Sequence, residues 1–362
     1  MQRFIYSSEE LSEYLTKKLW QRVFLVCGHS AEHLKVYKEL KQAEIEITQF
    51  SDFTPNPKYE DVKRGVELFK CNSYDGIIAI GGGSAIDVAK CIKIYSSMND
   101  QIEYIDQKIC ENNSILIVVP TTAGTGSEST KFSVIYYKGN KISVEHENCM
   151  PDVVLLDAEN LNTLPEFQRK VTLLDAFCHS VESYWSVNST IQSRIYSKKA
   201  LRIIVDTWRG YIRNESIANE SMLLAANIAG KAINIAKTTA GHAMSYKLTS
   251  KYGVAHGQAV AMCVRVLWKH LLQNVDTCDS REKEYVKGIL NEIATAMGAY
   301  TAQQGYDIFT SMLDELGLTS IHAVDENEIL YLADSVNEER LKNYPVKLKK
   351  NDIIKLYQEI LA

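Results

Sequence analysis

Apolar residues in the first half of the chain form short continuous runs, separated by segments whose apolar positions recur at helical spacing. Five runs predict buried strands, namely 22–28, 44–50, 76–83, 114–122 and 152–157. Three intervening segments predict helices, namely 30–43, 58–72 and 84–98. Alternation of strand and helix is typical of a mostly parallel sheet covered on both faces.

The pattern changes near residue 160. No comparable strand-like run follows, and long segments carry apolar residues at the spacing of a helix face. These predicted helices lie within 171–185, 197–212, 220–236 and 258–275. We therefore expect an α/β domain over residues 1–160 and an all-helical domain over 161–362.

Composition narrows the class of partner. The 362 residues include 46% hydrophobic and 23% charged residues, values typical of globular proteins, and the net charge of −5 argues against a nucleic-acid surface. No apolar run approaches the roughly 18 residues that span a bilayer, and the first fifteen residues do not resemble a signal peptide. Eight cysteines without a CxxC pair favour a reducing cytoplasm. We expect the chain to bind a small molecule, and neither nucleic acid nor a membrane. A homodimer or a larger homo-oligomer is the expected assembly.

Two glycine-containing loops follow predicted strands. Gly81, Gly82, Gly83 and Ser84 lead from one strand into a helix, where backbone N–H groups can cradle a pyrophosphate. The motif is neither GxGxxG nor a P-loop, and a tight strand-to-helix turn is the alternative. The second loop, 121–129, places hydroxyls and glycines after the next strand, where open α/β sheets bind ligands. Together the two loops favour a nucleotide site.

The helical half contains candidate metal ligands. Asp175 and His179 are four residues apart and so share one helix face, although such a pair is more often a simple hydrogen-bonded contact. Because the surrounding positions are apolar, a buried carboxylate there needs a partner. His242 and His256 flank the next helical segments and are the obvious further ligands. One carboxylate and three imidazoles suit iron or zinc.

In order along the chain, several motifs resemble the iron-containing (group III) alcohol dehydrogenases, which share a fold with dehydroquinate synthase. The motifs are PNP at 55–57, GGGSAIDVAK at 81–90, PTTAGTGSE at 120–128, PDVVLLD at 151–157, DAFCH at 175–179 and the spacing of His242 and His256. The resemblance covers essentially the whole chain. It implies a Rossmann-like dinucleotide-binding domain, an all-α metal-binding domain, and chemistry in a cleft.

The resemblance also implies roles for individual residues. Fe²⁺ or Zn²⁺ would be held by Asp175, His179, His242 and His256. NADPH or NADH would be held by residues of both loops and one later strand, namely Gly82, Gly83, Ser84, Asp87, Thr121, Thr122, Ser127 and Lys141. In such enzymes the metal polarises a carbonyl while the nicotinamide delivers hydride.

The chain departs from the family pattern at two positions. Where many members carry a pocket histidine four residues after the first late ligand, this chain has Tyr246, which can orient the substrate, relay a proton or simply pack. Where members that prefer NAD carry an aspartate, this chain has Ser51, followed by Asp52. Serine tolerates a 2′-phosphate, so NADPH is permitted, while Asp52 keeps NADH open.

The segment before His242 bears on the substrate. Lys237 lies five residues before this ligand, at a place where members acting on neutral alcohols are apolar or small, and it predicts an anionic substrate. A solvated helix-surface lysine is the alternative. The segment resembles the phosphonoacetaldehyde reductase branch, which implies reduction of phosphonoacetaldehyde to 2-hydroxyethylphosphonate. A generic alcohol dehydrogenase acting on neutral short-chain substrates and a dehydroquinate-synthase-like lyase remain as alternatives.

Overall fold

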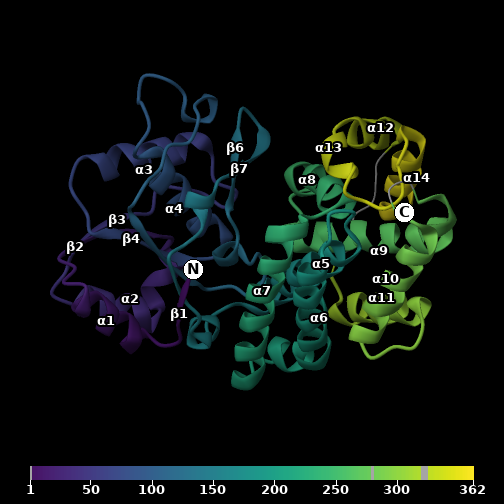
Figure 1. The fold of residues 1–362 in the computed structure, drawn as a ribbon, viewed down its shortest axis with the longest axis horizontal. Helices are drawn as coiled ribbons and strands as arrows, with labels where there is room; N and C mark the ends of the chain where they lie inside the picture. The colour runs from purple at the N-terminus through teal and green to yellow at the C-terminus, as the bar shows by residue number, and fades with distance from the viewer. Residues whose placement is uncertain (1, 279–280, 319–324) are drawn as a thin grey trace. The chain divides into compact units, whose positions relative to one another are not determined.

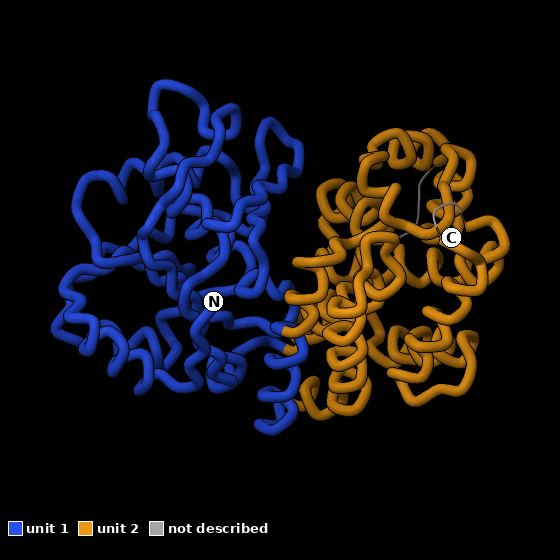
Figure 2. Tube along the Cα trace, in the orientation of Figure 1, with its two compact units in different colours: residues 1–165, 214–227 blue, residues 166–213, 228–362 orange. Residues whose placement is uncertain are grey.

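The computed structural model describes residues 2–278, 281–318 and 325–362, and the chain forms two compact units (Figures 1 and 2). One unit holds residues 1–165 with 214–227, and the other holds 166–213 with 228–362. Helix α7, Ser216–Ala236, contributes its first part to one unit and its second part to the other. The domain limit near residue 160 stays a prediction.

The first unit is built on a six-stranded parallel sheet with the strand order β1-β8-β5-β4-β2-β3. The strands are β1 Arg3–Ile5, β2 Arg22–Cys27, β3 Glu46–Phe50, β4 Gly76–Gly81, β5 Ile115–Pro120 and β8 Val153–Leu155. All five predicted strands are confirmed, with ends that differ by at most a few residues. The sequence analysis did not identify β1, which pairs with β8 at one edge of the sheet. A separate antiparallel hairpin joins β6, Phe132–Tyr137, to β7, Asn140–Glu145.

Helices cover both faces of the sheet, as the alternating pattern predicted. Phe24 and Val26 of β2 face a core that includes residues of α3, Tyr59–Lys70, and α4, Gly83–Tyr95. Their neighbours Val23 and Leu25 face the opposite core, together with residues of α1, Ser8–Lys17, and α2, Lys35–Gln42. Burial on both faces explains why the strands are continuous apolar runs.

The second unit is helical. Its long helices are α5 Glu166–Trp185, α6 Ile191–Ile212, α8 Ala240–Tyr252, α9 His256–Asn274, α10 Lys283–Ala296 and α11 Ala302–Leu316. The shorter ones near the C-terminus are α12 Glu326–Asp334, α13 Glu338–Leu341 and α14 Lys350–Ile360. Helix α5 packs against α6 and α9, and nearly all its residues from Leu173 onward are buried. The α/β fold with a helical second half is thus confirmed.

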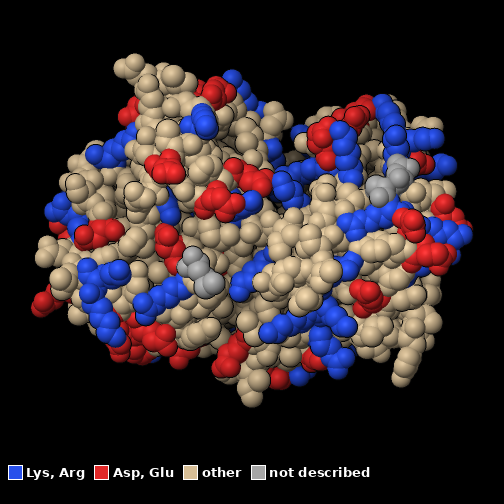
Figure 3. All heavy atoms as spheres, in the orientation of Figure 1, with Lys and Arg blue, Asp and Glu red and all other residues tan. Residues whose placement is uncertain are grey.

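The surface carries both signs of charge, and lysine and arginine are interspersed with aspartate and glutamate on the face drawn in Figure 3. No described helix combines the length and the apolar character that crossing a bilayer requires.

Candidate nucleotide loops and metal centre

The two glycine-containing loops meet at one edge of the sheet. Strands β4 and β5 pair in parallel with Gly81 opposite Pro120, and the Thr121 N–H donates to the Gly81 carbonyl (3.1 Å). A Cβ on Gly83 would lie 2.9 Å from Thr125 Cγ2, closer than side chains pack. Glycine therefore lets the start of α4 approach the second loop, as expected for parallel strands whose carboxyl ends share an edge.

The start of α4 presents backbone donors. Gly82 is the N-cap residue and supplies no side-chain acceptor to the first turn. A Cβ on Gly82 would lie 3.3 Å from both Cγ2 and Oγ1 of Thr122. Ser84 Oγ accepts from the Asn56 N–H (3.3 Å), so the Pro-Asn-Pro turn reaches the same helix end. Amides at a helix N-terminus can bind a phosphate, and Gly82, Gly83, Ser84, Thr121 and Thr122 are brought together here.

Asp87 and Ser127 take part in a polar network behind this edge. Ser127 Oγ donates to Asp87 Oδ1 (2.6 Å), and the Val134 N–H donates to Asp87 Oδ2 (3.0 Å). The Lys90 ammonium is fully buried, and five oxygens of Ser127, Thr130 and Phe132 lie within hydrogen-bond distance of its three N–H donors, at 2.6–3.1 Å. Such fully paired groups stabilise the second loop whether or not a nucleotide is present.

Two further predicted cofactor residues lie apart from the glycine loop in sequence. Lys141, on β7, is partly buried and acts electrostatically on Asp87. Ser51 follows β3 and accepts from Gln49 Nε2 (3.0 Å). The neighbouring Asp52 is exposed and forms an ion pair with Arg64, which also pairs with Asp61 (2.8 Å).

The predicted metal ligands converge in the helical unit. Asp175 Oδ1 lies 3.5 Å from His242 Nε2, 3.7 Å from His179 Nε2 and 4.0 Å from His256 Nε2. One ligand atom from each of Asp175, His242 and His256 lies within 4.8 Å of the others. His179 stacks on His242 with ring centroids 4.7 Å apart. Three helices, α5, α8 and α9, supply these four side chains.

The donor set fits a divalent cation. Asp175 Oδ1 and His242 Nε2 are both buried and have no hydrogen-bond partner among the described residues. Leaving such atoms unpaired is unfavourable unless a ligand satisfies them. Burial acts to raise the pKa of Asp175, but the three neighbouring imidazoles outweigh it and hold the pKa below its usual range. An ionised carboxylate beside imidazole nitrogens is a metal-ligand set of the iron and zinc type.

A glycine beside each late histidine makes the convergence possible. A Cβ on Gly257 would lie 1.9 Å from the Val171 carbonyl oxygen, so only glycine allows α9 to begin against α5. A Cβ on Gly241 would lie 2.6 Å from Val264 Cγ2 and 3.0 Å from Glu182 Oε1. His242 and His256 therefore stand at the beginnings of α8 and α9, as the sequence predicted.

Glu182 is a functional candidate that the sequence analysis did not identify. It is fully buried, and its Oε2 pairs with His242 Nδ1. Its Oε1 accepts from the N–H groups of Thr239 (3.0 Å) and Gly241 (2.9 Å) and from Thr239 Oγ1 (2.6 Å). Burial acts to raise the pKa of Glu182, but His242 and these donors outweigh it and lower the pKa. A His242 Nδ1–H directed at Glu182 leaves Nε2 unprotonated and able to coordinate a metal ion.

The two predicted substrate residues have different surroundings. Tyr246 lies one turn after His242 on α8, and its ring stacks on His256 at 6.2 Å between centroids. Its hydroxyl accepts from Arg340 Nη1 (2.7 Å). Lys237 is exposed, follows the last residue of α7, and has a left-handed backbone with φ of 59°.

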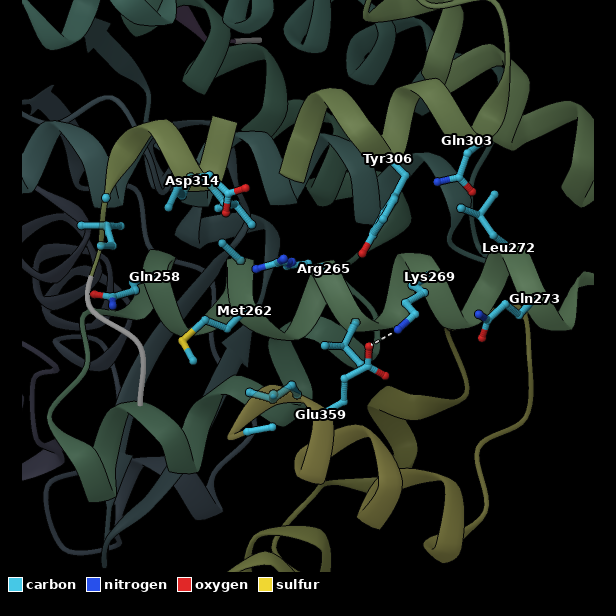
Figure 4. A pocket seen from close by; sticks show the side chains of 18 residues that line it. Gln258, Met262, Arg265, Lys269, Leu272, Gln273, Gln303, Tyr306, Asp314 and Glu359 are labelled. Carbon is cyan, nitrogen blue, oxygen red and sulfur yellow. Dashed lines mark hydrogen bonds and ion pairs between the residues drawn. The ribbon is translucent and has the colours of Figure 1, made fainter. Parts of the chain in front are cut away.

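A cavity of 860 Å³ runs along another part of α9 (Figure 4). Its lining includes Met262 and Arg265, and an ion pair between Lys269 of α9 and Glu359 of α14 (2.5 Å). None of the four predicted metal ligands lines it. Because it lacks these residues, the cavity is a weaker candidate for the reaction site than the cluster around Asp175.

Comparisons with known proteins identify the family to which the chain belongs. The family model for iron-containing alcohol dehydrogenase matches residues 4–158, and that for the C-terminal part of the Fe-containing alcohol dehydrogenase family matches 170–361. Long-chain-alcohol dehydrogenase 1 of Geobacillus thermodenitrificans is 26% identical over 91% of this chain and 85% of its own length. Phosphonoacetaldehyde reductase of Streptomyces viridochromogenes is 27% identical over 79% of this chain and 76% of its own. The structure of sulfoacetaldehyde reductase from Bifidobacterium kashiwanohense in complex with NAD⁺ superimposes with a TM-score of 0.89 at 23% identity, covering 100% of this chain and 97% of the other.

Proposed function

Because the chain belongs to the iron-containing alcohol dehydrogenase family, we propose that it is a metal-dependent NAD(P)H oxidoreductase that reduces a small anionic aldehyde. The proposed substrate is phosphonoacetaldehyde and the product is 2-hydroxyethylphosphonate. Family membership favours this oxidoreductase chemistry over the lyase chemistry of dehydroquinate synthase.

The cluster around Asp175 carries the proposal. Its buried Oδ1 and His242 Nε2 lack hydrogen-bond partners among the described residues, as expected of ligand atoms. We propose Asp175, His179, His242 and His256 as the ligands of one Fe²⁺ or Zn²⁺. When bound, such an ion supplies Lewis acidity to a carbonyl oxygen.

The chain's own groups then have defined tasks. Asp175 would neutralise part of the charge of the bound metal ion. Glu182 would hold His242 in the tautomer whose Nε2 can coordinate that ion. Tyr246 accepts a hydrogen bond from Arg340, and its hydroxyl is proposed to orient the substrate or to supply the proton for the alcohol oxygen.

The nucleotide is proposed to bind at the loops of the first unit. Gly82, Gly83 and Ser84 would receive its pyrophosphate at the start of α4, and Thr121, Thr122 and Lys141 would flank it. Asp87 and Ser127 would act by fixing the second loop, because their polar atoms are engaged with each other. With Ser51 at the end of β3, both NADPH and NADH are proposed as donors of hydride.

The anionic substrate has two supports. One is the similarity over most of the chain to phosphonoacetaldehyde reductase. The other is the positively charged side chain of Lys237, which is proposed to bind the anion and which precedes the proposed ligand His242 by five residues. A neutral aldehyde is the second candidate, because the long-chain-alcohol dehydrogenase is matched over a larger share of the chain.

A steady-state screen tests the proposal. Protein loaded with iron or zinc is assayed for oxidation of NADH and NADPH with phosphonoacetaldehyde, butanal and a sugar aldehyde. We expect the largest kcat/KM for phosphonoacetaldehyde. Comparable turnover of butanal would contradict the anionic substrate and favour the neutral candidate. Lys237→Ala should raise the KM for phosphonoacetaldehyde, and an unchanged KM would remove that residue from the proposal.

A further inference from the structure

We propose that Arg340 binds the acidic group of the substrate and thereby selects short aldehydes that carry a phosphonate, a sulfonate or a carboxylate. The inference rests on the proposed aldehyde reductase function and names a residue of α13 that sets its substrate class.

A short chain of contacts joins Arg340 to the metal-ligand cluster. Helix α8 carries His242 and, one turn later, Tyr246. The Tyr246 ring stacks on His256, whose Nε2 lies 4.0 Å from Asp175 Oδ1. Arg340 Nη1 donates to the Tyr246 hydroxyl, and its guanidinium carbon lies 5.4 Å from the ring centroid. One tyrosine ring thus separates the guanidinium from a proposed metal ligand.

Helix α13 provides a fixed position for this side chain. It packs against α8 and lies beside it in Figure 1. Asn337 caps its first turn by accepting from the Glu339 N–H (2.9 Å). The segment after it is anchored too, because Asn343 Nδ2 donates to the Thr238 carbonyl (3.0 Å), four residues before His242. The guanidinium is therefore held beside Tyr246, in the middle of α8.

The charge of Arg340 is not neutralised by another described residue. Two other cations, one on α8 and one directly after α13, are neutralised by ion pairs. Lys251 pairs with Glu328 (2.5 Å), and Lys342 pairs with Glu339 (2.5 Å). Lys247 lies over the Tyr331 ring at 5.9 Å. Within the described ranges, Arg340 forms no ion pair with a carboxylate, and it is partly buried. A partly desolvated guanidinium without a counter-charge gains free energy when an anion binds.

The chemistry of guanidinium suits this role. It offers five N–H donors in a planar fork, and the contact with Tyr246 uses one of them. The remaining donors can form the paired hydrogen bonds with which arginine binds phosphonate, sulfonate or carboxylate oxygens. A neutral aldehyde offers no such group, so the residue discriminates between the two candidate substrates.

Kinetics of single variants test the assignment on the metal-loaded enzyme. Arg340→Ala should raise the KM for phosphonoacetaldehyde by roughly 10- to 100-fold more than it raises the KM for butanal, the value of a charge-assisted hydrogen bond. Arg340→Lys keeps the charge but not the fork, and should give an intermediate KM. Lys342→Ala is the matched control, because this lysine is exposed, lies two residues away and is already paired. Thermal unfolding of each variant reports whether it is folded.

Inhibition by ethylphosphonate separates this inference from the proposed function. The anion should inhibit the wild type competitively against butanal, and Arg340→Ala should weaken that inhibition by a similar factor. If the wild type reduces phosphonoacetaldehyde no better than butanal, the proposed substrate fails, while loss of inhibition in Arg340→Ala would still support the anion site. Unchanged inhibition in a folded Arg340→Ala would overturn it. The inference would also be overturned if Lys237→Ala lost affinity for phosphonoacetaldehyde while Arg340→Ala kept it.

Discussion

Each unit of the molecule contains a group of buried polar side chains, and the two groups differ in how fully they are hydrogen-bonded. In the first unit, five oxygens behind the second loop lie within hydrogen-bond distance of the Lys90 ammonium. In the second, Asp175 Oδ1 and His242 Nε2 have no hydrogen-bond partner in the described part of the chain. Satisfied buried groups stabilise a fold, whereas unsatisfied ones need a ligand. The difference supports a stabilising role for the first group and the proposed metal binding for the second.

Removal of the metal should have the largest effect. We expect chelation to lower reductase activity by about 10³-fold or more, because Lewis-acid stabilisation is worth several kcal/mol. Adding Fe²⁺ or Zn²⁺ back should restore activity, and metal at 1,000 times its Kd should stabilise the fold by about 4 kcal/mol. Rates and thermal unfolding before and after chelation measure both effects. Full activity after chelation would contradict the assignment of the second group.

Lys90→Met should lower the stability of the fold and leave metal binding unchanged, whereas chelation removes the metal. Its removal leaves oxygens of Ser127, Thr130 and Phe132 without their donor, so we expect a loss of about 3–5 kcal/mol in unfolding free energy, with metal content unchanged. Urea unfolding and metal analysis are the measurements. Lys93→Met is the control on the same helix, because Lys93 has one carboxylate partner, Asp152 (2.9 Å), and should lose less. Equal losses in the two variants would contradict the special role of the network.

Glu182→Gln should weaken metal binding by about 10- to 100-fold, the usual effect of removing the partner of a ligating histidine. The glutamine oxygen can still accept from the Gly241 N–H, but the amide nitrogen cannot accept from His242 Nδ1. Competition with a chelator of known affinity measures the change. The control is Glu292→Gln, an exposed carboxylate that accepts from Tyr184. Equal metal affinity in Glu182→Gln and the wild type would show that Glu182 only accepts hydrogen bonds from the backbone at the start of α8 and does not support metal binding.

Gly83→Ala should have the smallest effect, a roughly 10-fold loss of NADH or NADPH affinity, because its methyl group occupies the approach to the helix amides. The added Cβ also meets Thr125 Cγ2 at 2.9 Å. Combining it with Thr125→Ser removes the Cγ2 contact and keeps Oγ1, which would lie 3.1 Å from the added Cβ, so the double variant tests how much of the loss comes from the closest packing contact. Fluorescence titration of the nucleotide measures both. Recovery of full affinity in the double variant would mean that packing, and not the phosphate site, explains the glycine.

The parts that the sequence predicted are those encoded by neighbouring residues. Strands buried on both faces become continuous apolar runs, and five of them were identified for this reason. The positions of His242 and His256 at helix beginnings followed from adjacent glycines and from the apolar segment after His256. By contrast, β1 is exposed at Arg3 and buried only at Ile5, so it forms no continuous apolar run, whereas the equally short β8 is buried throughout.

The missed residues act through contacts distant in sequence. Glu182 accepts from amides 57–59 residues later, and the one local signal was its place seven residues after Asp175, on the same face of α5. Arg340 contacts Tyr246 from 94 residues away, and no local pattern in the sequence encodes that contact. Tertiary packing thus determines both the support of the proposed metal ligands and the proposed selection of substrate.

The most direct test of the central claim is the metal content of Asp175→Asn beside that of the wild type, after both are loaded with Fe²⁺ or Zn²⁺ and dialysed. The asparagine keeps the size of the side chain and removes the charge on which three imidazoles converge. Our account predicts about one ion per wild-type chain and a loss of at least about tenfold in affinity for the folded variant. An Asp175→Asn protein that retains one tightly bound ion per chain would contradict the account.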